Sequence, residues 1–155
     1  MNFSIRQMIE TDIDNITRTF SRWNKQRKQY ELYWEEHQEG QRLTLVAVSE
    51  DQVVGYATLV WRPEYAPFRE AGIPEIKDMN VISEFQKQGI GTALIREAER
   101  IASAQGKEVM GIGFGLTPDY GAAQRLYPKL GYIPDGKGAQ VTPWGDVLYL
   151  TKRLK

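Results

Sequence analysis

The residues from Gln86 to Thr92 carry the clearest chemical signal in the sequence. They read Gln-Lys-Gln-Gly-Ile-Gly-Thr and stand where an expected strand gives way to an amphipathic helix. The first N–H groups of a helix have no partner inside it and carry partial positive charge. Glycines at 89 and 91 would let a phosphate approach that main chain, and Gln86, Lys87 and Gln88 would add donors. The pattern predicts an anion site for a phosphate or pyrophosphate, and a tight turn that merely needs small residues is an equal alternative.

Other chemistries have few residues to use. No Gly-Lys-Ser/Thr follows the turn and no Gly-x-Gly-x-x-Gly is present, so neither a Walker loop nor a dinucleotide fingerprint is expected. The chain has no cysteine, which excludes disulfides, thiolate metal sites and a cysteine nucleophile. Its single histidine, His37, gives little support to a histidine metal site or a Ser-His-Asp triad. We therefore expect no metal.

Composition narrows the class of protein further. The 155 residues fit one domain, expected over 1–155, with 41% hydrophobic and 26% charged residues and a formal net charge of zero. A nucleic-acid partner is not expected, because such proteins usually carry a basic excess. No apolar run is long enough for a membrane helix, and the first residues do not resemble a signal peptide. The cytoplasm is the expected location.

Hydrophobic periodicity and turn residues predict the elements that must position the turn. Strands are expected at 3–7, 43–48, 53–61, 74–81, 109–116, 132–134 and 147–151, the last two joined by a Gly-rich turn. Helices are expected from Thr11 or Asp12 to about residue 20, at 23–38, at 89–104 and from 118 to about 131. Residues 62–72 contain two prolines and a glycine and are expected to form a loop. In the helix at 89–104, the charged residues at 96, 97, 99 and 100 are expected to face solvent.

Two segments together resemble a known family. The turn Gln86-x-x-Gly89-x-Gly91 is similar to the Gln/Arg-x-x-Gly-x-Gly/Ala signature of the GNAT superfamily of N-acetyltransferases. Residues 123–132, Ala-Gln-Arg-Leu-Tyr-Pro-Lys-Leu-Gly-Tyr, resemble the family's Ala-x-x-Leu-Tyr-x-Lys-x-Gly-aromatic ending. One strand separates the two segments, as in the family, and the order of elements agrees from about residue 3 to 152.

The resemblance implies an α/β (α+β) fold with a mixed, mostly antiparallel sheet of six to seven strands flanked by about four helices. The fourth and fifth strands would splay apart to admit the pantetheine arm of acetyl-CoA. Acetyl-CoA is the implied cosubstrate. The residues implied to hold it are Met79, Asn80, Val81, Gln86, Lys87, Gln88, Gly89, Ile90, Gly91, Thr92 and Tyr127.

The resemblance also implies catalytic roles. Tyr127 matches a family tyrosine that lies near the sulfur and can protonate the departing thiolate. Glu75 has the spacing to Gly89 of the general-base glutamate in histone acetyltransferases, and Asp78 is a weaker candidate for the base. Many members use only ordered water and carbonyl groups, so the absence of a single base is a further alternative. Tyr120, where the family often has asparagine, and Pro128, inside the helix, depart from the pattern near Tyr127.

Two backbone patterns bear on the cofactor groove. Ile76 and Met79 are apolar but three apart, which breaks strand alternation and predicts a β-bulge near Lys77 and Asp78. Glycines alternate at 111, 113 and 115 on the next strand. Such a bare face is consistent with a pantetheine arm beside it, and packing against a helix is an equally good interpretation.

The expected function is transfer of an acetyl group from acetyl-CoA to a primary amine by direct attack, since no cysteine can carry an acyl-enzyme. In the family the acceptor approaches over the first helices and the loop before the fourth strand. Those segments are rich in aromatic and acidic residues, which are alternatively core or dimer contacts: Trp23, Tyr30, Tyr33, Trp34, Trp61, Tyr65 and Phe68 with Glu31, Glu35, Glu36 and Glu64. A non-catalytic acyl-CoA sensor or interaction module, and a general nucleotide-phosphate binder, are the alternatives. A homodimer is as compatible with the sequence as a monomer.

Overall fold

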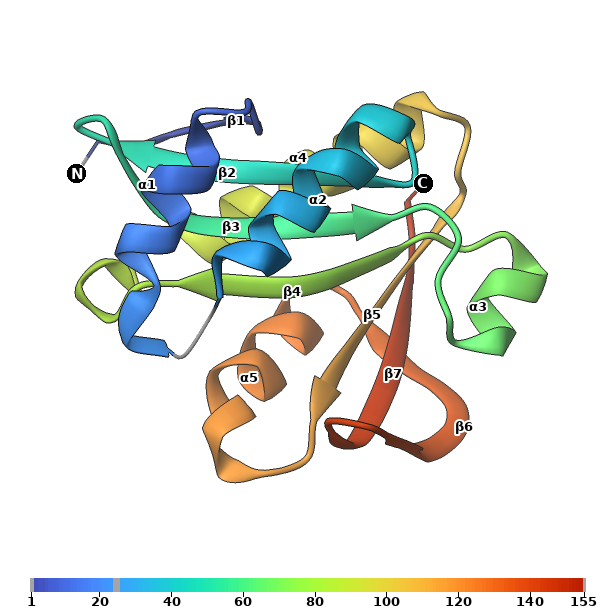
Figure 1. The fold of residues 1–155 in the computed structure, drawn as a ribbon. Helices are drawn as coiled ribbons and strands as arrows, with labels where there is room; N and C mark the ends of the chain where they lie inside the picture. Colours follow the sequence, from blue (N-terminus) through green and yellow to red (C-terminus); the bar gives the residue numbers. More distant parts are fainter. Residues whose placement is uncertain (1, 24–25, 155) are drawn as a thin grey trace.

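A seven-stranded sheet organises the chain, as the sequence predicts (Figure 1). The computed structural model describes residues 2–23 and 26–154. The strand order is β1-β2-β3-β4-β5-β7-β6, and every neighbouring pair is antiparallel except β4 and β5. The strands are β1 (Ser4–Gln7), β2 (Arg42–Ser49), β3 (Gln52–Val60), β4 (Glu75–Val81), β5 (Val109–Gly115), β6 (Ile133–Thr142) and β7 (Gly145–Arg153).

Five α-helices pack around this sheet within the described residues, one more than the four or so expected. Helices α1 (Asp12–Thr19) and α2 (Arg27–Glu39) cover one face of β2–β4, and α4 (Ile90–Ala104) covers the other. Helix α5 (Gly121–Lys129) lies beside β5, and the short α3 (Ala66–Ala71) lies at the end of β3 and β4 (Figure 1). Three single 3₁₀ turns, at Ser21–Trp23, Ser83–Phe85 and Pro118–Tyr120, precede α2, α4 and α5. No helix among the described residues is long and apolar enough to cross a membrane.

The amphipathic pattern of α4 explains how the sheet is covered from behind. Ile90, Leu94, Ile95 and Ala98 recur at helical spacing and are at most 1% exposed. They join Leu45, Leu59 and Ile76 of the sheet in the main hydrophobic core. Burial of this stripe fixes the rotation of α4, and with it the position of the turn that opens the helix.

The parallel pair β4–β5 is short. Only Glu75↔Gly111 and Ile76↔Ile112 are in register, and a main-chain bond from Gly111 N to Pro74 O adds to them. Beyond Ile76 the two strands diverge, while β4 stays paired to β3 as far as Val81. This is the splay that the resemblance implies.

Three expected boundaries were wrong at the starts of helices. The loop expected at 62–72 contains α3, which has Pro67 in its first turn, where proline is favoured, and buries Phe68. The helix expected at 23–38 is a 3₁₀ turn ending at Trp23 followed by α2 from Arg27, and residues 24–25 lie outside the described part. The helix expected from 118 begins with a 3₁₀ turn and becomes α-helical only at Gly121.

The end of the sheet also differs from expectation. Strand β6 runs from Ile133 to Thr142, and the glycines expected to form a turn, Gly136 and Gly138, lie inside it with positive φ. The register between β6 and β7 shifts between Pro134 and Ala139, so these glycines form a bulge rather than a chain reversal.

Glu99 was wrongly expected to face solvent. It is 9% exposed and accepts hydrogen bonds from Tyr132 Oη at 2.8 Å and Lys152 Nζ at 3.0 Å. This cluster joins α4 to β7 and to the segment that follows α5, so a charged residue on the predicted outer face of α4 is enclosed by the C-terminal strands.

Candidate active site

The turn between β4 and α4 leaves main-chain donors unused. Gly89 is the N-cap of α4 with φ of +89°, and no side chain caps the helix. The first helical bond is Ala93 N to Gly89 O, so the N–H groups before Ala93 have no acceptor within the helix. A side chain at 89 would meet no protein atom within 4 Å, so the space over this end of the helix is open. The arrangement suits an anion.

The side chains of the loop before Gly89 have two different states. Gln86 Nε2 donates to Val81 O at 2.8 Å and Gln88 Nε2 donates to Glu84 O at 3.3 Å, so both amides hold the loop in shape. Lys87 is exposed and has a left-handed backbone, with φ of +63°. Of the three residues expected to add donors, Lys87 is therefore the one whose charge faces solvent beside Gly89.

Gly91 lets α4 approach both walls of the splay. A side chain there would contact Met79 Cε of β4 at 3.5 Å and Leu126 Cδ2 of α5 at 3.6 Å. Met79 and Leu126 are partly buried against the core, and Ile90 is 1% exposed. The side chains of two expected cofactor residues, Met79 and Ile90, are therefore apolar and pack against the protein, so only their main-chain groups could bind a cofactor.

The remaining expected cofactor residues divide between the two faces of β4. Asn80 Nδ2 donates to Tyr56 Oη at 3.0 Å and to Asp78 Oδ1 at 2.8 Å, which directs this amide toward the α2 side of the sheet. Val81 is half-buried at the end of β4, and Thr92 is half-buried in the first turn of α4.

The alternating glycines of β5 make room for rings of the protein itself. A side chain at Gly111 would collide with Phe68 of α3, and one at Gly115 would collide with Tyr120. At Gly113 the neighbours would be Val147 and Tyr149 of β7. For Gly111 this agrees with the packing alternative, since Phe68 belongs to a helix, and the glycines thus carry no separate signal for a pantetheine arm.

Tyr127 lies in the last turns of α5, against the splayed end of β5. Its ring centroid is 6.1 Å from that of Phe114, and the residue is 6% exposed. Burial raises the pKa of its phenol well above 10, so the hydroxyl stays protonated at neutral pH. The hydroxyl makes no hydrogen bond to any described residue. Its oxygen is not among the fully buried polar atoms that lack a partner, so this protonated donor, which has no acceptor among the described residues, is within reach of a ligand.

Glu75 lies within the short β4–β5 ladder, opposite Gly111 and one residue before the last registered pair. It is 4% exposed and makes no hydrogen bond or ion pair with the described residues. Burial raises the pKa of its carboxyl from 4.5 to about 7, although the positive charges of Lys77 and Arg42 oppose the shift. Buried carboxylates are seldom left without a partner, so this one is a functional candidate on physical grounds.

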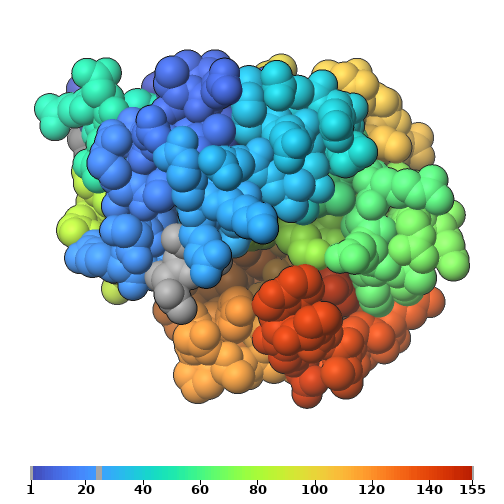
Figure 2. All heavy atoms as spheres, in the orientation of Figure 1, coloured from blue at the N-terminus to red at the C-terminus, as the bar shows by residue number. Residues whose placement is uncertain are grey.

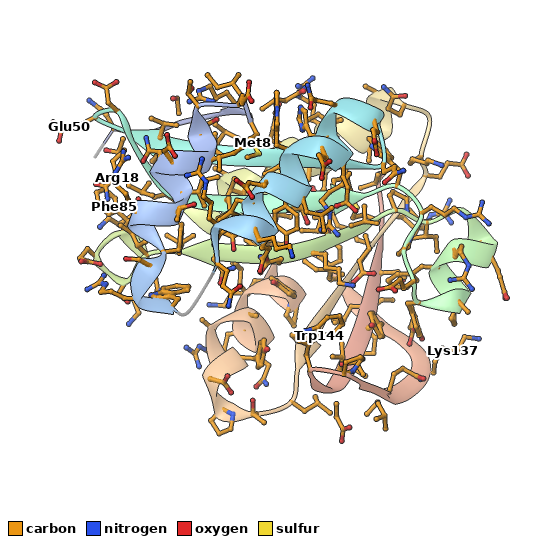
Figure 3. The ribbon with its side chains drawn as sticks, viewed as in Figure 1. Met8, Arg18, Glu50, Phe85, Lys137 and Trp144 are labelled. Carbon is orange, nitrogen blue, oxygen red and sulfur yellow. The ribbon has the colours of Figure 1, made fainter. Side chains whose placement is uncertain are left out.

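Aromatic residues near Glu75 include two that the sequence did not single out. Tyr149 of β7 stacks on Tyr65 at 3.8 Å between ring centroids, and Tyr65 Oη donates to Asp135 at 2.6 Å. Trp144, at the β6–β7 turn, is 72% exposed, and Lys77 Nζ lies 5.3 Å from its ring centroid. Figure 3 shows Trp144 in front of β5 and β7, below β4. The β6–β7 turn reaches this position because both strands are longer than the sequence pattern predicted.

Three of the seven aromatic residues expected at an acceptor site are buried, namely Tyr30, Tyr33 and Phe68. Three more, Trp23, Trp34 and Trp61, are partly buried against the core, which agrees with the core alternative. An open hollow of about 650 Å³ nevertheless lies along α2, lined by Gln26, Lys28, Gln29, Glu31, Leu32 and Glu35. Figure 2 shows the β6–β7 turn (red) at the surface, separated from α2 (blue) by a recess.

Comparisons with known proteins agree on one group. The model of the acetyltransferase (GNAT) family matches residues 10–132. Among solved structures, yncA from Salmonella typhimurium with its cofactor acetyl-CoA has a TM-score of 0.77 at 24% identity, covering 100% of this chain and 95% of that one. Ribosomal-protein-alanine N-acetyltransferase from Brucella melitensis has 0.78 at 23%, covering 97% and 99%. PaiA N-acetyltransferase from Thermoplasma acidophilum, in complex with coenzyme A, has 0.70 at 17%, covering 99% of each chain. No curated protein sequence matches the chain significantly.

Proposed function

Because the chain belongs to the GNAT acetyltransferase family, we propose that it transfers the acetyl group of acetyl-CoA to a primary amine by direct attack in a ternary complex. The observation that carries the proposal is the uncapped start of α4, placed at the open end of the β4–β5 splay. Structural neighbours solved with acetyl-CoA or coenzyme A support the choice of ligand.

The cofactor would bind along β4. Its pyrophosphate would accept hydrogen bonds from the first N–H groups of α4, with Lys87 adding positive charge. Its pantetheine arm would enter the splay beside Met79. The unpaired edge of β4 beyond Ile76 supports this path, since an edge offers main-chain donors and acceptors that a ligand can use.

Glu75 would remove the proton that prevents the amine from attacking. An alkylammonium has a reference pKa near 10.4, so at neutral pH it must lose a proton before its nitrogen lone pair is free. A carboxylate with a pKa of about 7 is a stronger base than an ordinary glutamate and is still half ionised at neutral pH. The amine nitrogen then bonds to the thioester carbonyl carbon, and main-chain N–H groups at the bulge near Met79 stabilise the developing oxyanion.

Tyr127 would complete the transfer. As the carbon–sulfur bond breaks, its phenol donates a proton to the departing sulfur. The nitrogen of the tetrahedral intermediate releases its surplus proton, which reprotonates Tyr127 through solvent, leaving the amide and free coenzyme A. The raised pKa of Tyr127 keeps the proton on the phenol at neutral pH, so a proton is present to donate. It also makes the phenol a weaker acid than an alkyl thiol, whose reference pKa is about 8.5, so the transfer must accompany cleavage of the carbon–sulfur bond and not follow it.

Two measurements test the proposal in sequence. Titration calorimetry with coenzyme A measures binding, and thiol release from acetyl-CoA across a panel of primary amines measures transfer. We expect binding and turnover with at least one class of amine. Absence of heat with coenzyme A would refute the assigned ligand. Tight binding without turnover on any amine would favour the acyl-CoA sensor, and preference for ATP would favour the nucleotide-phosphate binder.

A further inference from the structure

Asp78 occupies a strained position inside β4. The register between β3 and β4 shifts between Tyr56↔Asn80 and Thr58↔Lys77, which places a bulge at residues 78 and 79. Asp78 has φ of +54°, in the left-handed region that costs most side-chain-bearing residues about 1–2 kcal/mol and that aspartate and asparagine enter more often than the others. The strain persists only if the surroundings hold the residue in place.

The carboxylate of Asp78 accepts hydrogen bonds from side chains of α2, β3 and β4. Its Oδ2 accepts hydrogen bonds from Tyr33 Oη at 2.7 Å, Gln29 Nε2 at 2.9 Å and Tyr56 Oη at 3.1 Å. Its Oδ1 accepts from Asn80 Nδ2 at 2.8 Å. Hydrogen bonds to an ionised carboxylate are stronger than neutral ones. Four of them can offset the backbone strain of one left-handed residue.

Two of these donors come from the helix on the acceptor side. Gln29 and Tyr33 are one turn apart in the first half of α2, and Gln29 also lines the hollow along that helix. Within the described residues, every side-chain bond from α2 to β4 ends at Asp78. The C-terminal half of α2 is tied to β2 instead, through Glu36 to Arg42 and His37 to Thr44 N.

We propose that Asp78 is a positioning residue that fixes the β4 bulge and ties it to α2, so that the main-chain donors at residues 78–79 keep the orientation that the reaction needs. The inference rests on the proposed function, since the bulge adjoins the edge of β4 that would receive the thioester. In this role Asp78 needs no contact with either substrate. Its carboxylate acts through the backbone of its own bulge and through Gln29 and Tyr33.

Asp78→Asn tests this role with little change in shape. Asparagine tolerates the left-handed backbone, but its NH₂ group must face donors that the carboxylate accepted. We expect kcat to fall by about 10- to 100-fold, less than the roughly 10²- to 10³-fold lost when an oxyanion donor is removed outright, because here the donors are misdirected and not deleted. The Kd of coenzyme A should change by less than about threefold, because the pyrophosphate site lies at the far end of β4.

Further variants separate positioning from folding. Asp78→Gly relieves the backbone strain yet removes the four hydrogen bonds from the described residues, so a loss of kcat in this variant assigns the effect to the carboxylate. Tyr33→Phe removes one donor and should lower kcat by less, again without weakening coenzyme A. The matched control is Asp12→Asn, which changes another hydrogen-bonded carboxylate, a buried one that accepts bonds from Arg6 and Ile9 N. It should lower the free energy of unfolding and leave kcat unchanged.

An activity-independent measurement completes the test. Amide hydrogen exchange at residues 78–81 should accelerate in Asp78→Asn and not in Asp12→Asn. Wild-type kcat in both folded Asp78 variants, or unaltered exchange at 78–81, would overturn the inference. A wild-type protein that binds no coenzyme A and acetylates no amine would instead overturn the proposed function, and the exchange result would still decide whether Asp78 holds the bulge.

Discussion

At its carboxyl end β4 leads into a turn that offers main-chain N–H groups to open space, whereas at its amino end Glu75 holds a side-chain carboxylate in a nearly closed environment. The candidate site at the turn before α4 consists of main-chain groups. Its glutamine side chains hold the loop in shape, and its glycines leave the space over the helix open. The candidate site at Glu75 depends on one ionisable group whose pKa is set by burial. Substitutions should therefore act on binding at one end of the strand and on proton transfer at the other.

The largest expected effect is on proton transfer. Glu75→Gln removes the proposed base and should lower kcat by about 10²- to 10⁴-fold, the range for loss of general base catalysis. In the wild type, kcat/KM should rise with pH through about 7 as Glu75 ionises, and this limb should disappear in the variant. Rate–pH profiles measure both. Glu97→Gln on α4, which removes a surface pairing with Arg100, is the control. A variant with wild-type rate and profile would show that no single carboxylate acts as base.

The same substitution should affect stability in the opposite direction. The folded protein holds the Glu75 proton up to about pH 7, whereas the unfolded chain releases it near 4.5. The native state binds more protons between these values, so its free energy of unfolding falls as pH rises through this window, by about 3 kcal/mol at most. Glu75→Gln should be more stable than the wild type at pH 8 and lose this dependence. Denaturant unfolding at pH 5 and pH 8 measures the difference. If the free energy of unfolding changed equally between these pH values in the wild type and the variant, the assigned pKa would be contradicted.

At the other end of β4, two glycines give a matched pair. Gly89→Val places a branched side chain at a left-handed position and over the open helix start, and should weaken coenzyme A by about 10- to 50-fold. Gly91→Ala adds a methyl group in ordinary contact with Met79 and Leu126 and should bind nearly as the wild type does. Calorimetry distinguishes the two. Equal binding by both variants would remove the main-chain site from the proposal.

The smallest expected effect concerns two tyrosines five residues apart. Tyr127→Phe removes a hydroxyl that has no partner among the described residues. It should lower kcat by about tenfold, below the usual range for loss of a general acid, because a thiolate can depart without full protonation, and it should keep the free energy of unfolding. Tyr132→Phe removes a donor to Glu99 and should lower stability by about 1–3 kcal/mol with little change in kcat. Steady-state kinetics and thermal unfolding on the same samples separate them. The reverse assignment would exclude Tyr127 as the general acid.

The contrast along β4 also explains what could be predicted from sequence. The turn was visible because the start of α4 has a positive φ at Gly89, which favours glycine, and the bulge was visible because Ile76 and Met79 break alternation. Sheet type and the burial of α4 follow from hydrophobic patterning. Trp144 and Tyr149 were missed because their placement depends on the true lengths of β6 and β7, which the positive-φ glycines at 136 and 138 disguise as a turn. The partners of Asp78 and Glu99 were also out of reach, since they come from elements up to 53 residues distant in the chain.

The brevity of the β4–β5 ladder has a mechanical consequence. Two registered residue pairs join the four strands β1–β4 to the three strands β5, β7 and β6. Few main-chain hydrogen bonds therefore hold these two parts of the sheet together. Under an applied force, β4 and β5 would separate before the other strand pairs of the sheet. A ligand bound between β4 and β5 would contact both parts of the sheet and link them. Its binding and release would therefore change how rigidly the two parts move together.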